Sequence, residues 1–516
     1  MGCAVTYCRM MLLLGMLISM PERLPADDKE VLERVIHMTG GKGTVYFMLG
    51  AVSEQSGYLF IYDSKVVDNN RIVRLKSGPR TVSRAVYEIV GNDALKLRVL
   101  GKHILIYLPE SRPVVSGKPD TLSFFTLEGT LLDKQSGDPV VYGTIGVEGT
   151  SVGSITNSNG EFRLRLPDSL KQGRIHISHL GYAAQELDIS ILAGRHTVLP
   201  MEPRIMEMPE IIVRSVDPVR ILKEMLNRRS ENYSGNAVYL TTFYREGIKY
   251  KQKFRSLTEA VFKIYKTPPD NYLFADQVKL IKKSSIINND EKDTLIARIS
   301  SGIDACLQLD LIKQLPDFLT PGSNDNIYDY TSGKATMIDN KLVNRVCFEQ
   351  KKGIKSPFYR GELYIDDLSG ALLQANIEIH PDFVEKASDM LVVRKARTIK
   401  IIPQKVAYTV SYKPYNGTYY INHIRGDLFY KVKKKYQWFG NSVLHTWFEM
   451  VTCRIDTGNV VRFSRSERIP TRNVFSEDGF KYDEDFWGEF NVIPWEQQLR
   501  EIIDEISIKV EKFIGQ

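Results

Sequence analysis

The sequence has few cysteines and histidines for its length. Its 516 residues include 5 Cys and 8 His. Cys3 and Cys8 precede an apolar segment at the N-terminus. The remaining three, Cys306, Cys347 and Cys453, allow at most one disulfide, and their wide separation argues against a metal cluster. The histidines form no His-x-x-Glu or His-Glu-x-x-His motif. We therefore predict buried, inert thiols and no metal site.

The nearest approach to a metal-binding pair is His445 and Glu449. If their segment is a strand, both side chains lie on one face of it, because successive residues alternate between faces. Aromatic and polar residues alternate along ordinary strands as well, so we favour sheet packing over metal binding. No clustered carboxylate pair and no nucleophile motif stands out either. The sequence predicts a protein that is not an enzyme, with no catalytic residue and no cofactor.

A hydrophobic run long enough to cross a membrane is also missing. Residues 10–20 are the strongly apolar segment, about half of the roughly 20 residues that a membrane helix needs. Because this run follows Arg9 near the N-terminus, we predict that residues 1–26 are a secretory signal peptide, with Ala26 as the best cleavage position. The mature chain is then exported, has no transmembrane span, and resides in the periplasm or at the outer membrane.

The excess of positive charge is small and dispersed. The sequence has 69 Lys and Arg against 62 Asp and Glu, a net charge of +7. Nucleic-acid binding needs a concentrated basic patch, so we expect no nucleic-acid partner. One compact basic run, Lys431-Val-Lys-Lys-Lys435, adjoins an aromatic strand. We interpret it as a solvated sheet edge whose charges block strand pairing.

Short alternating segments are abundant. The content of 43% hydrophobic and 25% charged residues is typical of globular proteins, and the length suffices for about three domains. In residues 125–182, apolar residues recur at every second position and are interrupted by Gly, Asp, Asn and Pro. This pattern predicts a half-buried antiparallel sheet with tight turns, in a small β-sandwich.

The order of residues in this stretch is specific. It contains a Gly-x-Leu-x-Asp start at 129–133, a Gly-x-Pro turn at 137–139, a Val-x-Gly-Thr strand at 147–150, a Thr-x-x-x-Gly-x-Phe hairpin at 156–162 and a late Gly-Tyr at 181–182. Residues 124–213 thereby resemble the carboxypeptidase regulatory-like domain, a transthyretin-like sandwich common in envelope proteins of Bacteroidetes-type bacteria. The resemblance implies an accessory module without catalytic residues. Asn157 and Asn159 stand where that family often has Asp, which disfavours bound Ca²⁺.

Residues 40–109 are predicted to form two helix–strand units. The expected elements are helices capped by Thr44 and Thr81 and ended by Gly57 and Gly91, strands at 58–62 and 71–75, and a hairpin at 95–107 around Gly101. The glycine-rich residues 40–44 lack the spacing of a phosphate-binding loop, so we interpret them as a turn that enters the first helix.

Several details of this region follow a known pattern. The helix placement, the Gln55-Ser-Gly57 helix stop, the Tyr62-Asp63 pair and the final hairpin resemble the secretin and TonB short N-terminal domain. Members of that family sit in the periplasm at the front of outer-membrane proteins, where some contact inner-membrane regulators. The resemblance implies a docking module, and a stable spacer is the alternative.

Residues 217–516 alternate long aromatic strands with turns. A helix begins at Asp217, strands follow between 239 and 455 with a helical stretch at 303–315, and a final helix with an apolar stripe is predicted from Pro494. In architecture, without a diagnostic motif, this succession resembles the half-barrel of lipoprotein-carrier proteins. We interpret the aromatic side chains as core packing, with the lining of an apolar ligand cavity as the alternative.

The predicted fold class is therefore multidomain and mainly β with α+β parts: a small βαβ-type domain, a β-sandwich and a large curved antiparallel sheet with helices. The predicted function is that of a non-enzymatic binding or docking protein of the cell envelope, associated with the outer membrane or its partners. Two alternatives remain open: a periplasmic carrier or chaperone for an apolar ligand or lipid, and a regulatory component that acts through residues 40–109. No partner-binding residue can be named from the sequence.

Overall fold

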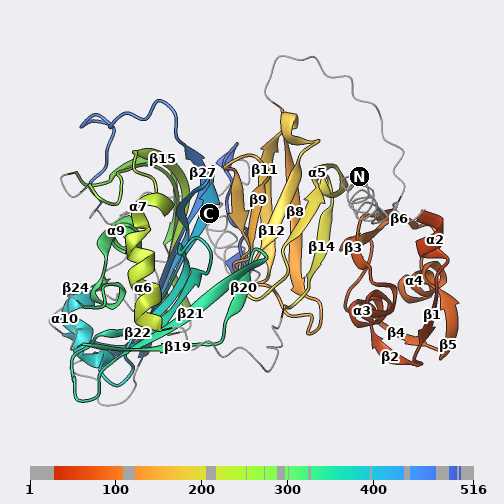
Figure 1. Ribbon diagram of the computed structural model, residues 1–516, viewed down its shortest axis with the longest axis horizontal. Coiled ribbons are helices and arrows are strands. Elements are labelled where there is room, and N and C mark those ends of the chain that lie inside the picture. The colour runs from red at the N-terminus through yellow and green to blue at the C-terminus, as the bar shows by residue number, and fades with distance from the viewer. Residues whose placement is uncertain are drawn as a thin grey trace, which may run out of the picture. The chain divides into compact units, whose positions relative to one another are not determined.

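The computed structural model divides the chain into two compact units, residues 1–116 with 198–200, and residues 117–197 with 201–516. The residues that it describes are 28–108, 123–204, 217–251, 253–271, 274–287, 297–299, 302–322, 327–395, 398–434, 442–471, 487–496 and 499–500. The predicted signal peptide at 1–26, the linker before the sandwich and most of the predicted C-terminal helix lie outside these residues. Figure 1 labels the elements of both units.

The two main helices of the first unit begin and end where their capping residues predict. Helix α3 (Val45–Ser56) starts at Thr44, whose hydroxyl accepts a hydrogen bond from the Phe47 amide, and stops at Gly57 with φ 77°. Helix α4 (Val82–Val90) has Thr81 and Gly91 in the same roles, and Gly91 has φ 66°. A left-handed residue after a helix favours glycine. Both predicted helices are confirmed.

Short strands surround these helices. They are β1 (Val35–Met38), β2 (Gly41–Thr44), β3 (Leu59–Asp63), β4 (Ile72–Leu75), β5 (Gly78–Thr81), β6 (Lys96–Leu100) and β7 (His103–Tyr107), preceded by α2 (Asp28–Leu32). Strand β3 pairs with β7 in parallel, and the pairs β6–β7, β1–β5 and β2–β4 are antiparallel. The predicted turn at residues 40–44 is wrong, because the backbone of this segment pairs with β4 and forms strand β2.

The second unit begins with the predicted sandwich. Its elements are β8 (Phe124–Asp133), β9 (Thr144–Val147), β10 (Gly153–Ile155), β11 (Glu161–Pro167), η1 (Asp168–Leu170), β12 (Arg174–Ser178), β13 (Gln185–Asp188), α5 (Ile189–Leu192) and β14 (His196–Met201). One sheet has the order β10-β9-β12-β13, and β8 lies between β11 and β14. Buried and half-buried residues alternate along β11, with Phe162 and Leu164 in the core. The predicted alternation is confirmed.

The turn before β11 is built by the Asn157 side chain. Its Oδ1 accepts hydrogen bonds at 2.9 Å from the amides of Asn159 and Glu161, and its Nδ2 donates to the Glu161 carboxylate at 3.0 Å. This side chain is 3% exposed. An asparagine side chain that bonds its own following backbone stabilises a turn without an ion. Asn157 therefore has a structural role here.

A curved antiparallel sheet dominates the second unit. Its strands are β15 (Val238–Tyr250), β16 (Lys253–Lys266), β17 (Gln277–Ile287), β19 (Tyr328–Ser332), β20 (Thr336–Ile338), β21 (Lys341–Gln350), β22 (Tyr359–Asp366), β23 (Leu372–Ile379), β25 (Ile399–Tyr415), β26 (Thr418–Lys434) and β27 (Ser442–Asp456). The order is β17-β16-β15-β27-β26-β25-β23-β22-β21-β19, with β20 paired to β21. The last long strand thus pairs with the first, so the sheet depends on contacts that are distant in sequence.

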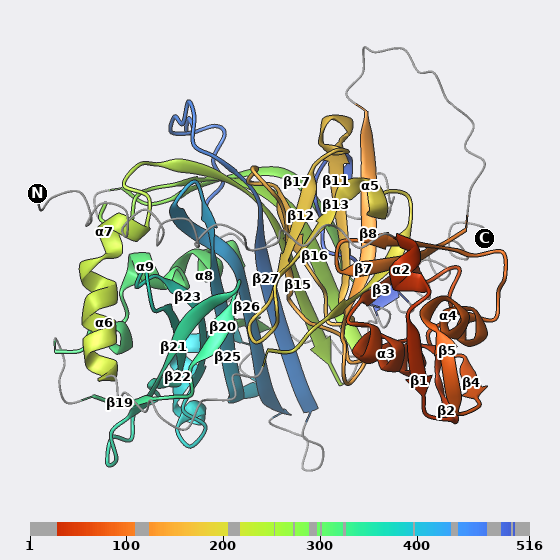
Figure 2. The same cartoon turned by 45° about the vertical axis from the view of Figure 1, so that its right-hand side comes forward.

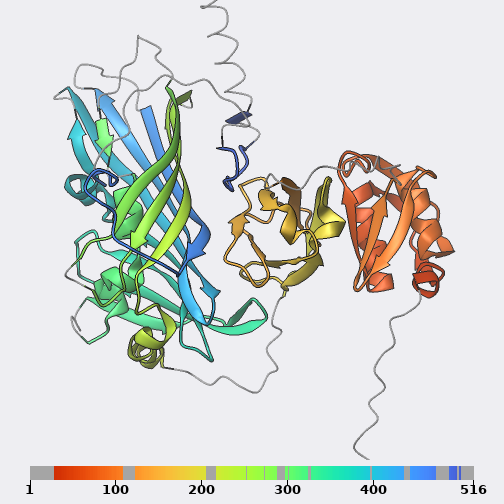
Figure 3. The same cartoon turned by 90° about the horizontal axis from the view of Figure 1, so that it is seen from above.

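Helices cover one face of this sheet, which we call the inner face. The side chains of Tyr244, Phe262 and Phe448 lie on this face. The smaller elements of this region are α6 (Pro218–Asn227), α7 (Arg229–Asn232), β18 (Ala297–Ile299), α8 (Ile303–Gln308), α9 (Leu311–Gln314), η3 (Asp317–Leu319), η4 (Val384–Ala387), α10 (Ser388–Leu391) and β24 (Val392–Lys395). Figures 2 and 3 show the strands curving around these helices, with the sandwich beyond the opposite, outer face. None of the helices in the described ranges is long and apolar enough to cross a membrane.

The aromatic side chains of the inner face belong to the main core. Tyr244, Phe262 and Phe448 are fully buried in one cluster with Leu222 of α6 and Ile312 of α9. Packing of this kind is what the sequence led us to expect of these residues. The predicted fold class, mainly β with a β-sandwich and a large curved antiparallel sheet, is confirmed.

The basic run at 431–435 is not a sheet edge at its first lysine. Lys431, Lys433 and Lys434 lie in β26, which pairs with β25 on one side and with β27 on the other. Lys431 itself faces Ile402 and Val443. The interpretation as an edge is therefore wrong for Lys431, because long-range pairing, which charge patterns do not reveal, places it between two strands. Lys433 and Lys434 are paired with β25 alone among the described residues.

The three cysteines of the second unit are unpaired. Cys306 and Cys453 are buried, and Cys347 is half-buried. Burial raises the pKa of the Cys306 thiol and raises the pKa of Cys453 to about 11. Because the thiolate is the reactive form, both thiols are inert at neutral pH. The prediction of buried, inert thiols is confirmed for these two residues.

Candidate ligand pocket between the sandwich and the curved sheet

Within the second unit, a tight turn of the curved sheet contacts the sandwich. Asp339 and Asn340, between β20 and β21, have φ values of 53° and 58°, as a two-residue hairpin turn of type I′ requires. The Asp339 carboxylate binds His176 Nε2 on β12, and Asn340 Oδ1 accepts a hydrogen bond from Arg204 at 3.1 Å. The hydrogen bond to Asp339 raises the pKa of His176, and the same bond lowers the pKa of Asp339.

A second set of contacts lies along the outer face of the sheet. The Ser151 hydroxyl donates to the Ile455 carbonyl at 2.8 Å and accepts from the Ile455 amide at 3.0 Å. The Asn422 amide donates to the Thr144 hydroxyl at 3.0 Å. Ile155 of β10 packs in one buried cluster with Phe243 of the outer face. We call this contact zone between the sandwich and the sheet the seam.

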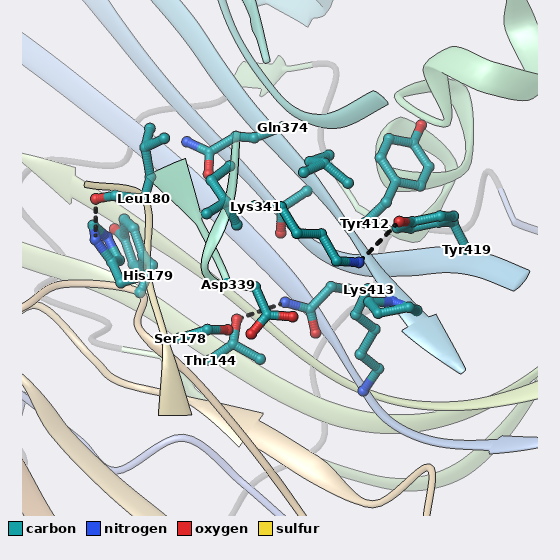
Figure 4. Close-up of a pocket in the computed structure, with 16 residues that line it drawn as sticks. Thr144, Ser178, His179, Leu180, Asp339, Lys341, Gln374, Tyr412, Lys413 and Tyr419 are labelled. Carbon is teal, nitrogen blue, oxygen red and sulfur yellow. Dashed lines mark hydrogen bonds between the residues drawn. The ribbon is translucent and has the colours of Figure 1, made fainter. Parts of the chain in front are cut away.

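A cavity of about 80 Å³ lies in the seam and is lined from both sides. We call it the seam pocket. The lining includes Asp339, Lys341 and Lys413 of the curved sheet and Thr144 and Ser178 of the sandwich. Figure 4 shows the Lys341 amine directed towards Tyr419 and the Lys413 amine directed away from Lys341. The volume corresponds to roughly a few water molecules, whereas pockets for drug-sized ligands measure about 300 Å³ or more. The pocket therefore has room for one small polar group.

Lys413 is the more deeply buried of the two cations that line the pocket. Its Nζ donates to the Thr452 carbonyl at 2.7 Å. Among the residues that the structure describes, no carboxylate lies within ion-pair distance of this ammonium. Burial lowers the pKa of Lys413 to about 8, because desolvation disfavours the charged form.

Lys341 is the second cation, and its contacts are loose. Its Nζ lies 3.5 Å from the Tyr419 hydroxyl and 4.0 Å from the Asp366 carboxylate. The Lys341 side chain is 39% exposed, which places it where the pocket meets solvent. An ammonium group has three donors, so Lys341 keeps donor capacity for a further acceptor.

Other charges of the outer face are bound to one another. Arg245 lies 2.7 Å from Glu259 and 3.4 Å from Glu449. Arg425 contacts Glu449 at 3.6 Å and Asp427 at 2.9 Å. Burial raises the pKa of Glu449, whereas the pKa of Asp427 is lowered because its bonds to His445 and Arg425 outweigh burial. These side chains form a connected, largely buried ionic network.

His445 and Glu449 lie on the outer face of β27, as their spacing predicts for a strand. Each has its own partner: His445 Nε2 lies 3.0 Å from Asp427, and Glu449 binds Arg245 and Arg425. Four residues of a strand also separate two side chains by about 13 Å, too far for one ion. Among the described residues, no three His, Cys, Asp or Glu side chains gather as a metal-binding group.

A separate ionic cluster fastens α9 to β16 and β17. Lys266 Nζ lies 2.6 Å from both Asp276 and Asp310, and Lys313 Nζ lies 2.6 Å from Asp276. The Tyr412 hydroxyl donates to Asp310 at 3.1 Å. Burial opposes ionisation of Asp276, but the two lysines lower its pKa to about 2. Closely paired and enclosed, these charges stabilise the fold and are not arranged for chemistry.

The sequence analysis did not identify the residues of the seam pocket. Lys413 and Lys341 are 72 positions apart in the chain, and their neighbours in the pocket come from the sandwich. A local signal exists for one part: Asp339 and Asn340 are residue types that tolerate the positive φ of a type I′ turn. It could have indicated the hairpin, although not its contact with His176.

Comparison with known families identifies one part of the chain. Residues 127–213 match the family model of the CarboxypepD_reg-like domain. This agrees with the resemblance described for residues 124–213 and covers the sandwich alone. No curated protein matches the chain.

Several solved structures resemble the chain at low similarity. One is described as an outer membrane lipoprotein-sorting protein domain from Vibrio parahaemolyticus, with 10% identity, 48% of this chain and 95% of that chain covered, and a TM-score of 0.22. A LolA superfamily protein from Nitrosomonas europaea has 9% identity, 46% and 93% coverage, and a TM-score of 0.17. The Pseudomonas aeruginosa MucA/MucB complex has 11% identity, 48% and 96% coverage, and a TM-score of 0.15. Similarities at this level carry no argument about function.

Proposed function

We propose that this chain is a non-enzymatic binding protein of a bacterial cell envelope, in the periplasm or at the outer membrane. Residues 40–109 act as a docking module that contacts envelope proteins. The body formed by the sandwich and the curved sheet recognises the ligand or partner. The sandwich at 124–213 supports the envelope setting, because the domain that it resembles is common in envelope proteins.

The seam pocket is the observation that carries this proposal. Buried charges elsewhere in the body face opposite charges, as Arg245 faces Glu259 and Lys266 faces Asp276. Lys413 has no such partner among the described residues, and it lines a cavity between two parts of the fold. Convergent polar groups in a cavity between parts of a protein are typical of binding sites. Covalent catalysis would instead need a nucleophile within reach of a base.

The carrier alternative has less support. A carrier for an apolar ligand would need an apolar cavity along the curved sheet. The aromatic side chains of the inner face instead pack against α6, α8 and α9 in one core. The regulatory alternative shares the docking step through residues 40–109 and would add a signal that docking transmits to the bound envelope protein.

Affinity capture from detergent-solubilised envelopes of the source bacterium tests the proposal. The bait is the full mature chain, and the control is Lys405→Met, which alters an exposed lysine on the same strand as Lys413. We expect both baits to recover the same envelope proteins, and the contact to persist with purified components. Recovery of no protein together with extractable lipid would favour the carrier, and turnover of a substrate would favour an enzyme.

A variant of the first unit tests the docking module separately. Phe47 and Ile72 are 51% and 59% exposed, and Thr44, which caps the helix of Phe47, pairs with Ile72 across β2 and β4. Replacing Phe47 and Ile72 by Ser removes exposed apolar surface without altering the core. We expect the double variant to fold normally and to recover less of the partner. Unchanged recovery would argue that residues 40–109 are a spacer.

A further inference from the structure

We propose that the seam pocket binds a carboxylate group of a ligand, with Lys341 and Lys413 as the positive charges of its lining. The inference rests on the proposed binding function and specifies its ligand class. Its basis is a cavity with two cations, hydrogen-bond donors from both sides of the seam, and room for one small group.

The environment of Lys413 indicates that a group bound beside it would be negatively charged. An ammonium removed from water without a nearby anion is unfavourable, and an added opposite charge relieves this. Lys413 donates to the Thr452 carbonyl, which satisfies one of its three donors. Two other enclosed cations, Lys266 and Arg245, each contact two carboxylates. An anion next to Lys413 would give it a comparable environment.

The charge of the lining favours an anion with a single negative charge. Lys341 and Lys413 contribute two positive charges, and Asp339, which also binds His176, contributes one negative charge. A doubly charged phosphate would meet the Asp339 carboxylate in the same small space. The pocket lining also contains no arginine, although the guanidinium fork is well suited to phosphate. A carboxylate, planar and singly charged, fits both the net charge and the volume.

The other polar groups of the pocket suit carboxylate oxygens. The Tyr419 hydroxyl lies 3.5 Å from Lys341 Nζ, and Ser178 and Ser411 are among the residues that line the pocket. The apolar side chains of Leu180, Ile338 and Leu373 also line it. A lining that contains both polar and apolar side chains suits a carboxylate that carries a short aliphatic portion.

Ligand-observed NMR titration of the full mature chain tests the inference. The probes are N-acetylglycine and its neutral isostere N-acetylglycinamide. We expect N-acetylglycine to bind with a Kd of about 1 mM, as befits a ligand of few atoms, and the amide to bind at least tenfold more weakly. Lys413→Met and Lys341→Met should each weaken binding at least tenfold, whereas Lys405→Met should not.

Two further arms complete the test. Acetate and the peptide Ala-Ala-Ala, with and without C-terminal amidation, distinguish a free small acid from a peptide C-terminus: tighter binding of the unmodified peptide than of acetate identifies the terminus.

Binding should also weaken as the pH rises above about 8, since the pKa of Lys413 is about 8. Asp339, with a lowered pKa, and Cys453, with a pKa raised to about 11, keep their charge states near this pH. His176, which binds Asp339, has a raised pKa and also loses its charge as the pH rises, so this arm is run in the His176→Asn background.

The inference is overturned if N-acetylglycine and acetate fail to bind, or if they bind Lys413→Met as well as the parent chain. Thermal unfolding shows whether a variant is folded, and Lys341→Met provides an independent second variant. Failure of the carboxylates while envelope capture succeeds would remove this inference and leave the binding function in place. Failure of capture while carboxylates bind would remove the docking role instead.

Discussion

Arg245 and Glu259 lie directly opposite each other on β15 and β16, 2.7 Å apart, and each side chain is 2% exposed. Arg245 also donates to the Ile493 carbonyl at 2.5 Å, and Glu259 accepts a hydrogen bond from the Trp495 indole at 2.8 Å. The pair therefore holds the segment 487–496 against the outer face of the sheet. Because both charges are desolvated, each depends on the other.

Removing one partner of this pair should be strongly destabilising. Glu259→Gln leaves the Arg245 charge buried with the more distant Glu449, so we expect a loss of about 3 kcal/mol in the free energy of unfolding. Urea unfolding measures it. The matched control is Glu224→Gln, whose partner Arg220 is 61% exposed, and an exposed pair of this kind contributes about 0.5 kcal/mol or less. Equal losses in the two variants would contradict the assigned role.

Acid should destabilise the second unit through Asp276. Its folded pKa of about 2 lies below the ordinary value of 3.8, so its contribution is present above about pH 4 and is lost as the pH falls towards 2. The shift corresponds to about 2 kcal/mol. Urea unfolding at pH 6 and at pH 3 should show about half of this loss, roughly 1 kcal/mol, because pH 3 is still above the folded pKa. This pH dependence should shrink in Asp276→Asn. An unchanged slope in that variant would assign acid sensitivity to other carboxylates.

Gly247 should resist replacement because an aromatic ring occupies the space of its missing side chain. Gly247 faces Trp447 across β15 and β27, and a Cβ there would lie 2.6 Å from the indole ring. The ring itself stacks on Arg425 at 4.5 Å, so it cannot easily move. We expect Gly247→Ala to reduce the free energy of unfolding by about 1–3 kcal/mol. Gly235→Ala, with open space around it, is the control and should change little.

Local signals account for the parts of the fold that could be predicted. Thr44, Gly57, Thr81 and Gly91 act within one helical turn, so their roles follow from neighbouring residues. The sandwich likewise has its turn residues close together in sequence. By contrast, β27 pairs with β15 across about 200 residues, and no local pattern encodes that register.

The candidate site was beyond prediction for the same reason. Lys413 on β25 looks like any lysine of an alternating strand. Its special environment arises because the sandwich, more than 200 residues earlier in the chain, lies over the outer face of the sheet. Lys431 shows the reverse error, since it belongs to a pattern typical of a sheet edge but pairs with strands on both sides. Burial by distant segments, rather than residue type, decides which charged groups have shifted pKa values.

The pair of His176 and Asp339 should make the seam sensitive to pH. Since its bond to Asp339 raises the folded pKa of His176 above the ordinary value of 6.5, the stability that it contributes is complete below about pH 6.5 and is lost as the pH rises through the folded pKa. Partial exposure of both side chains, 31% and 28%, limits the size of the effect. We expect the free energy of unfolding to fall modestly between pH 6 and pH 9.

Asp339→Asn is the sharpest variant for this prediction. Asparagine suits the positive φ of the type I′ turn, so the hairpin should persist while the negative charge is removed. Urea unfolding from pH 6 to pH 9 should then lose the component that depends on His176, and His176→Asn should lose it as well. The exposed His37 of the first unit provides the control His37→Asn, which should keep the parent slope. If Asp339→Asn also keeps that slope, the ion pair does not link the sandwich to the sheet, and the wall of the seam pocket must be held by the contacts of Ser151 and Asn422.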